Sequence, residues 1–154
     1  MGLRIRHLFV RRSAFISATP ERVWQEFETS DRIAAWLDQG HVLESLQAGL
    51  GGQVEMSVEI DGSRRAFGGP IVVYEPAREM SIAMRWYEPW GPAYATAVPS
   101  YWTFLLTPLY TGTLVEIFHH GFELTGDDAG DNLEGYEEGW DVKHLKALRA
   151  IVEA

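Results

Sequence analysis

Histidine is the most informative of the residue types in this chain that can do chemistry. The five histidines are His7, His41, His119, His120 and His144, and the chain contains no cysteine. A neutral imidazole can act as a general base, a hydrogen-bonding group or a metal ligand. The absence of cysteine excludes a thiol nucleophile, a thiolate metal site and a disulfide framework.

His119 and His144 are the candidates for an interior role. His119 falls on the apolar face of an expected strand, and His144 falls on the apolar face of an expected helix. In a pocket, either ring would serve as a hydrogen-bond donor or a general base, whereas a histidine satisfied by its core neighbours is the simpler interpretation. Successive strand residues point to opposite faces, which separates His119 from His120 and Glu116. We therefore expect no metal and no cofactor.

Motifs for covalent or nucleotide chemistry are missing. The sequence has no GxxxxGK[ST], HExxH, GxSxG or GxGxxG pattern. The acidic run 127–131 lacks the glycine and glutamate spacing of a calcium loop. These absences favour a binding protein over an enzyme.

Aromatic side chains are numerous, with 6 Trp, 6 Tyr and 7 Phe. A packed core explains such residues, and a ligand cavity lined by some of them is the alternative. Trp86 and Trp102 are the best cavity candidates because they flank an irregular segment, 87–100, which could act as a lid. The full set expected to line a cavity is Trp36, Met56, Phe67, Tyr74, Ile82, Met84, Trp86, Trp102, Phe104, His119, Trp140 and His144.

The first third of the chain predicts one strand followed by two short helices. The strand lies within residues 4–18. Thr19-Pro20 is typical of a helix start, with an N-cap followed by proline at the first helical position. Ser30-Asp31 predicts the cap of a second short helix, which ends at Gly40.

The middle of the chain predicts an antiparallel meander. Alternation over 54–60, followed by Asp61-Gly62, is a strong hairpin signal. The return strand spans 64–74, and Gly68, Gly69 and Pro70 predict a bulge or bend there. The further strands expected are those that carry Met80 to Trp86, Trp102 to Leu106, and residues 113–122.

A long helix is expected to close the chain after an acidic loop at 123–132. Apolar residues at steps of three and four predict helix over 133–153, with Gly139-Trp140 inside it. Strands and helices are thus segregated, and the class is α+β: a curved antiparallel sheet of about six to seven strands with one long C-terminal helix packed across it. The whole chain, 1–154, is expected to form a single domain, with a pocket between helix and sheet.

Residues at the joints between these elements carry a resemblance to a known family. The matching pieces are Ala18 to Trp24, Trp36-Leu37, Gly51-Gly52, Gly69, Glu75-Pro76, Leu106-Thr107-Pro108, Gly112-Thr113, His119 to Phe122 and Gly139-Trp140. In order and spacing the chain resembles the activator-of-heat-shock-protein-90-ATPase-like family of the START-like (SRPBCC) superfamily. The resemblance implies the helix-grip fold.

The function that the resemblance implies is the binding of an apolar or aromatic small molecule. Two alternatives stay open: a co-chaperone domain acting on a heat-shock-protein-90-type ATPase, and a cyclase- or dehydratase-like enzyme that uses His119 or His144. As a partner we accordingly expect a small molecule, with a chaperone as the alternative, and either a monomer or a homodimer.

The net charge is −9, from 22 acidic and 13 basic residues, and it is localised. The segment 116–141 holds nine acids and no Lys or Arg, so the rest of the chain is balanced. The net negative charge argues against a nucleic acid or an anionic membrane as partner. If the acidic segment borders the pocket, it also disfavours an anionic ligand. With no secretory signal and no spanning segment in the sequence, a cytoplasmic location is expected.

Overall fold

A seven-stranded antiparallel sheet forms the frame of the molecule. A computed structural model of the protein describes residues 8–87, 98–125, 136 and 140–154. The strands are β1 (Phe9–Ile16), β2 (Val42–Leu46), β3 (Gln53–Ile60), β4 (Ser63–Glu75), β5 (Glu79–Trp86), β6 (Ser100–Leu109) and β7 (Gly112–His120). Their order across the sheet is β1-β7-β6-β5-β4-β3-β2, so the first strand pairs with the last. The predicted α+β class is confirmed.

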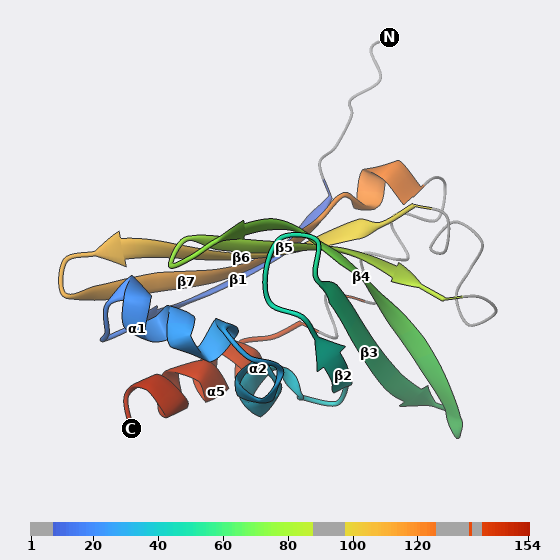
Figure 1. Ribbon diagram of the computed structural model, residues 1–154, viewed down its shortest axis with the longest axis horizontal. Coiled ribbons are helices and arrows are strands. Elements are labelled where there is room, and N and C mark those ends of the chain that lie inside the picture. The colour runs from blue at the N-terminus through green and yellow to red at the C-terminus, as the bar shows by residue number, and fades with distance from the viewer. Residues whose placement is uncertain (1–7, 88–97, 126–135, 137–139) are drawn as a thin grey trace, which may run out of the picture.

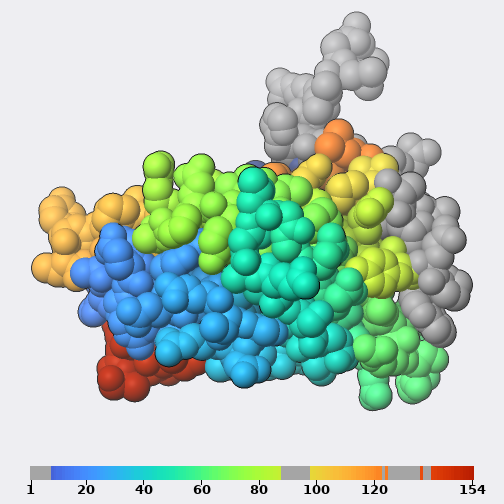
Figure 2. Space-filling view, viewed as in Figure 1, coloured from blue at the N-terminus to red at the C-terminus, as the bar shows by residue number. Residues whose placement is uncertain are grey.

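The helices lie together on one face of this sheet (Figure 1). They are α1 (Pro20–Trp24) with the 3-10 turn η1 (Gln25–Phe27), α2 (Ser30–Leu37) and α5 (Lys143–Val152), and a further 3-10 turn, η2 (Phe122–Thr125), follows β7. α2 and α5 are in contact with each other. From the side shown in Figure 2, the α1–α2 segment and the residues leading into β3 form a continuous surface. None of the described helices is long and apolar enough to span a membrane.

Both predicted helices begin near the expected residues, but the N-cap of α2 lies one residue earlier than predicted. Thr19 Oγ1 accepts a hydrogen bond from the Arg22 amide at 3.2 Å, which is the N-cap expected for α1. For α2 the cap is Thr29, whose hydroxyl accepts from the Arg32 amide, so the prediction of a Ser30-Asp31 cap is wrong. Ser30 is instead the first helical residue. α2 ends at Leu37, before Gly40.

The β3–β4 hairpin forms as predicted. Asp61 and Gly62 both have positive φ, 52° and 79°, as a two-residue turn of this kind requires. The bulge expected at 68–70 is wrong, because these residues stay in register with β3. The irregularity lies between Ile71 and Val73, where β4 pairs with β5.

The C-terminal helix is shorter than expected. Residues 126–135 and 137–139, which include Gly139, lie outside the described part, but Trp140 and Asp141 are described and are not helical. α5 begins only at Lys143, so a continuous helix over 133–153 is wrong. Trp140 still lies beside the sheet, and its amide donates to the Tyr136 carbonyl at 2.8 Å.

The hydrophobic core fills the space between the helices and the inner face of the sheet. Alternate residues of two strands face this core: Met80, Ile82 and Met84 of β5 are buried, as are Val115, Ile117 and His119 of β7. α2 contributes Trp36, and α5 contributes Leu145 and Leu148. The aromatic side chains that concern function are all part of this layer.

Candidate functional site

Five aromatic side chains from separate segments form a continuous arc at the amino end of α5. We call this set, His41, Phe67, Trp102, Trp140 and His144, the aromatic arc. Successive ring centroids are 5.7, 5.9, 4.8 and 4.7 Å apart in that order. Phe67 also packs against Trp86 at 4.6 Å.

Two buried polar atoms of the arc have no hydrogen-bond partner. They are Nε1 of Trp102 and Nδ1 of His144, and the only other such side-chain atom in the described part of the chain is Nε of Arg65. Trp102 is 4% exposed and His144 is 3% exposed. A buried donor without a partner costs about 1–3 kcal/mol, and native proteins rarely leave one unexplained. Both rings contact the same indole, that of Trp140.

The two histidines at the ends of the arc are neutral near pH 7. Burial lowers the pKa of His41, and the nearby Lys143 ammonium lowers it further. Burial also lowers the pKa of His144, although a hydrogen bond between its ring and the backbone of Asp141 opposes the shift. At the amino end of α5, His41 and His144 therefore act as uncharged hydrogen-bonding groups.

His119 lies behind the arc and is fully satisfied. Its Nδ1 accepts a hydrogen bond from Nε1 of Trp140 at 2.9 Å, and its Nε2 is 2.6 Å from Oγ of Ser100. Because an indole N–H can only donate, Nδ1 carries no proton and the ring is the Nε2–H tautomer, which donates to Ser100. Burial lowers the pKa of His119 well below its ordinary value. Both nitrogens are engaged, which supports an interior structural role over a general base.

Tyr136 connects His119 to the sheet end of the site. Its ring centroid is 4.3 Å from that of His119, and its hydroxyl accepts a hydrogen bond from Nε1 of Trp86 at 3.1 Å. Phe122 also packs against His119, at 4.5 Å, and against Tyr136, at 5.4 Å. The imidazole is thus held in a fixed orientation by aromatic neighbours.

The remaining residues expected in a cavity lie elsewhere in the same layer. Trp36 and Phe104 pack against each other at 5.6 Å and against Phe27, and the indole N–H of Trp36 donates to the Glu26 carbonyl. Met56, Ile82 and Met84 are buried along the inner face of the sheet. Tyr74 is half-buried beside Trp24, 5.3 Å away, and burial raises its pKa.

Three residues of the site were missed by sequence reasoning. His41 lies in the connection after α2, where the sequence shows no periodicity. No pattern therefore indicated that its side chain faces the interior. Ser100 was assigned to the irregular segment, whereas it is the first residue of β6. It lies two residues before Trp102 and therefore faces the same, inner side of the sheet. Tyr136 was not singled out as a site residue, and its contact with His119 places it beside the arc.

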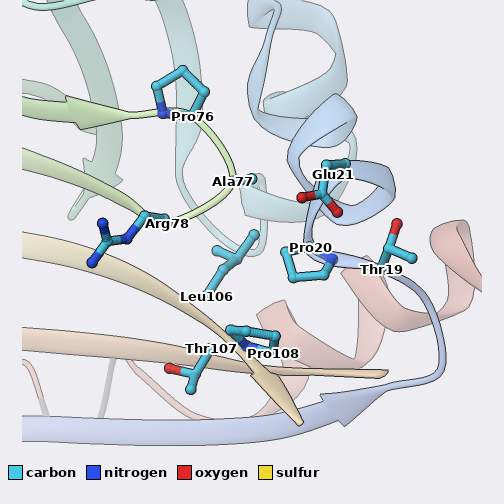
Figure 3. Close-up of a pocket in the computed structure, with 9 residues that line it drawn as sticks. All are labelled: Thr19, Pro20, Glu21, Pro76, Ala77, Arg78, Leu106, Thr107 and Pro108. Carbon is cyan, nitrogen blue, oxygen red and sulfur yellow. The ribbon is translucent and has the colours of Figure 1, made fainter. Parts of the chain in front are cut away.

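A surface groove lies at the opposite end of the sheet (Figure 3). It has a volume of about 690 Å³ and runs between the start of α1, the turn that joins β4 to β5, and the end of β6. Its charged side chains are Glu21 and Arg78, which are exposed, and the Arg78 guanidinium points away from Glu21. The Thr19 hydroxyl is already used as the α1 cap. The groove therefore holds no buried polar group that would orient a ligand.

A metal centre finds no support in the described residues. They contain no group of three or more His, Asp or Glu side chains that could hold an ion. Glu116 lies on the outer face of the sheet, where it pairs with Arg11. His120 shares that face and contacts the Thr103 hydroxyl, on the opposite side of β7 from His119.

The fold and the buried aromatic layer define the class of the protein: an α+β helix-grip domain, with its helices closed over one face of a curved seven-stranded sheet. The family model described as "Activator of Hsp90 ATPase homolog 1-like protein" matches residues 17–153. The chain belongs to this family.

Solved structures share the fold at low sequence identity. Protein CV1439 from Chromobacterium violaceum is 26% identical, with a TM-score of 0.67, and the match covers 95% of this chain and 98% of that one. DynU16, from the dynemicin biosynthetic locus, is 18% identical with a TM-score of 0.67, and covers 95% of this chain and 47% of its own. Aha1 of Colwellia psychrerythraea, solved as a dimer, is 16% identical with a TM-score of 0.62, over 93% and 95% of the two chains. A search of curated proteins found no match.

Proposed function

We propose that this protein binds a small apolar or aromatic molecule between α5 and the inner face of the sheet, at the aromatic arc. The observation that carries the proposal is the pair of buried, unpartnered polar atoms, Nε1 of Trp102 and Nδ1 of His144, on either side of the Trp140 ring. Ligand sites combine an apolar lining with a few polar groups that fix orientation. A guest that carries a polar group would remove the cost of leaving these atoms unpaired.

The proposed lining is the part of the set expected from the sequence that meets at the arc, with His41 added. Phe67, Trp86 and Trp140 supply the apolar walls, and Trp102 and His144 supply the polar contacts. Membership of the family is consistent with ligand binding, and one structure of similar fold is a protein of the dynemicin biosynthetic locus. The five residues of the arc do not include a nucleophilic side chain paired with a base, which covalent catalysis needs.

Native mass spectrometry and thermal shift with a panel of neutral aromatic compounds test the proposal. We expect a complex of one ligand per chain and a raised melting temperature. Phe67→Trp adds volume inside the arc and should abolish the shift. Phe15→Trp makes the same change at an exposed position of β1, where 41% of the residue surface is accessible, and should bind as the parent does. No response from any compound, or equal binding by both variants, would overturn the proposal.

A co-chaperone role is the second candidate, and it is supported by the family description alone. It predicts that an excess of this protein stimulates the ATPase of a heat-shock-protein-90-type chaperone. Phe67→Trp should leave that stimulation intact, because the substitution is internal. An unchanged ATPase rate at saturating protein would remove this candidate and leave ligand binding unaffected. Light scattering decides between the expected monomer and homodimer.

A further inference from the structure

We propose that the guest is an uncharged aromatic carbonyl compound whose oxygen accepts a hydrogen bond from Nε1 of Trp102. This inference rests on the proposed ligand-binding function and deepens it by naming the chemistry of the ligand.

Trp102 differs from the other described tryptophans in leaving its N–H without an acceptor. Trp36 donates to the Glu26 carbonyl at 3.0 Å, Trp86 donates to the Tyr136 hydroxyl, and Trp140 donates to His119. Trp24 has a hydrogen-bond contact with the Tyr74 hydroxyl. An indole nitrogen cannot accept a hydrogen bond, so the group that completes the Trp102 site must be an acceptor.

A trapped water fits this position poorly. A buried water needs two to four polar partners. Among the described residues, the rings that contact Trp102 are those of Phe67, Trp140 and His119. Both nitrogens of His119 are already used, so these rings offer a water no second partner. An acceptor oxygen attached to an apolar, ring-sized body satisfies the N–H and also packs against these faces.

The charges around the arc disfavour an ionised guest. His41, from the segment between α2 and β2, and His144, from α5, are both neutral near pH 7. The charged groups that act on them are Lys143 and Asp141, which are exposed and of opposite sign. A carboxylate beside Trp102 would lose its hydration at a cost of several kcal/mol, and none of the described rings that contact Trp102 carries a charge to offset that cost. An ammonium would find no acceptor at Nε1 of Trp102 and would lose its hydration on burial.

A ligand series on one scaffold tests the chemistry of the guest. Isothermal titration calorimetry with 2-acetonaphthone, naphthalene, 2-naphthoate and 2-naphthylmethylamine varies the polar group while the rings stay the same. We expect the ketone to bind about tenfold more tightly than naphthalene, since one net hydrogen bond separates them. The naphthoate and the amine should bind more weakly than the ketone.

Trp102→Phe removes the donor and keeps an aromatic ring. In this variant the affinity for the ketone should fall to that for naphthalene, whereas Trp24→Phe, outside the arc, should keep the preference. If Trp102→Phe does not fold, the indole N–H signal of Trp102 in the parent protein replaces it. That signal should move downfield with the ketone and much less with naphthalene.

The outcomes separate the two proposals. Equal affinity for ketone and naphthalene, or a tighter complex with the naphthoate or the amine, overturns the inference and leaves ligand binding standing. Loss of the ketone preference in Trp24→Phe as much as in Trp102→Phe also overturns it. If none of the four compounds binds, the proposed function itself fails at this site.

Discussion

His119 shows how one hydrogen bond can decide the role of a side chain. The indole N–H of Trp140 points at Nδ1, so protonation of that nitrogen would place two donors face to face. The ring is therefore held as the neutral Nε2–H tautomer, with Ser100 as its acceptor. An enzyme that used His119 as a base would first have to break this arrangement.

The tautomer is directly observable. Long-range ¹H–¹⁵N spectra should show His119 with an unprotonated Nδ1 and no titration between pH 8 and pH 5.5, because burial lowers its pKa well below 6.5. His120, on the outer face, provides an internal comparison in the same spectrum. A titration of His119 with a midpoint near 6.5 would contradict the assignment.

Substitution of His119 should cost stability, whatever the function. His119→Phe leaves the Trp140 N–H and the Ser100 hydroxyl without partners, which predicts a loss of about 2–3 kcal/mol in the free energy of unfolding. Urea denaturation measures this loss. Ser100→Ala removes only one of the two contacts and should cost about 1 kcal/mol. A neutral result for His119→Phe would mean that the two hydrogen bonds are not formed.

At the residue scale, the alternation of side chains along the strands predicted which residues of β6 and β7 face the site. Alternation placed Trp102 and His119 inward, and it correctly separated His119 from His120. The sequence could not predict which donor meets which acceptor, because those pairs join residues far apart along the chain. Ser100 and Tyr136 became visible only through their contacts with His119 and Trp86.

At the element scale, β4 shows why a glycine can matter in a strand interior. The sequence suggested a bulge around Gly69, but the strand stays paired there. A Cβ at this position would lie 1.7 Å from the backbone oxygen of Ala83 in β5. The glycine therefore permits a close approach of two strands.

Gly69→Ala should accordingly be strongly destabilising. Because the clash is with backbone, the strands must separate, and we expect a loss of about 3 kcal/mol or more, or failure to fold. Gly40→Ala is the matched control, since a Cβ at Gly40 meets nothing within 4 Å and only the φ of +94° is unfavourable. Thermal or urea denaturation should rank Gly69→Ala well below Gly40→Ala. The reverse order would contradict the packing of β4 on β5.

The start of α5 depends on Asp141. Its Oδ1 accepts a hydrogen bond from the Lys143 amide, and Val142 at the N-cap position has no side chain that could do so. Asp141→Ala should lower the free energy of unfolding by about 1 kcal/mol, whereas Asp141→Asn, which keeps an acceptor oxygen, should lose much less. Equal losses in the two variants would argue against capping.

Two elements could not be read correctly from the sequence, for physical reasons. β2 carries a register shift between Leu43 and Ser45, so its buried residues, Leu43 and Leu46, are three apart and show no alternation. The C-terminal segment keeps a helical spacing of apolar residues although the helix is interrupted at Trp140. Periodicity reports which side chains face inward, not whether the backbone between them is continuous.

At the scale of the whole molecule, stability should fall in mildly acidic solution. Burial lowers the pKa of His41, His119 and His144, so below pH 6.5 the unfolded chain binds protons that the folded chain does not. We expect the free energy of unfolding to be constant above pH 7 and to drop by on the order of 1–2 kcal/mol between pH 6.5 and pH 5.

Urea denaturation at several pH values measures this drop. His144→Gln should flatten part of it, because one of the three shifted groups is removed. The lowered pKa of Glu44, caused by its hydrogen bonds to Ser57 and Arg64, acts in the same direction but below pH 4.5. A parent protein equally stable at pH 7 and pH 5 would contradict neutral burial of the histidines.

The architecture was predictable at this scale because independent signals agreed. The hairpin turn, the helix cap and the inward rows all favoured a sheet covered on one face by helices, as observed. The ligand could not be predicted in the same way, since its chemistry depends on a single unpaired N–H and on the charge states of two histidines. Those properties exist only after the segments have come together.

The most direct test of ligand binding at the aromatic arc is the ¹H–¹⁵N signal of the Trp102 indole, assigned by its loss in Trp102→Phe, during titration with 2-acetonaphthone. We predict a saturable downfield shift of this signal in the parent protein, with the Trp24 and Trp36 signals nearly unchanged. A Trp102 signal that stays still while the ketone is in excess would contradict binding at the arc.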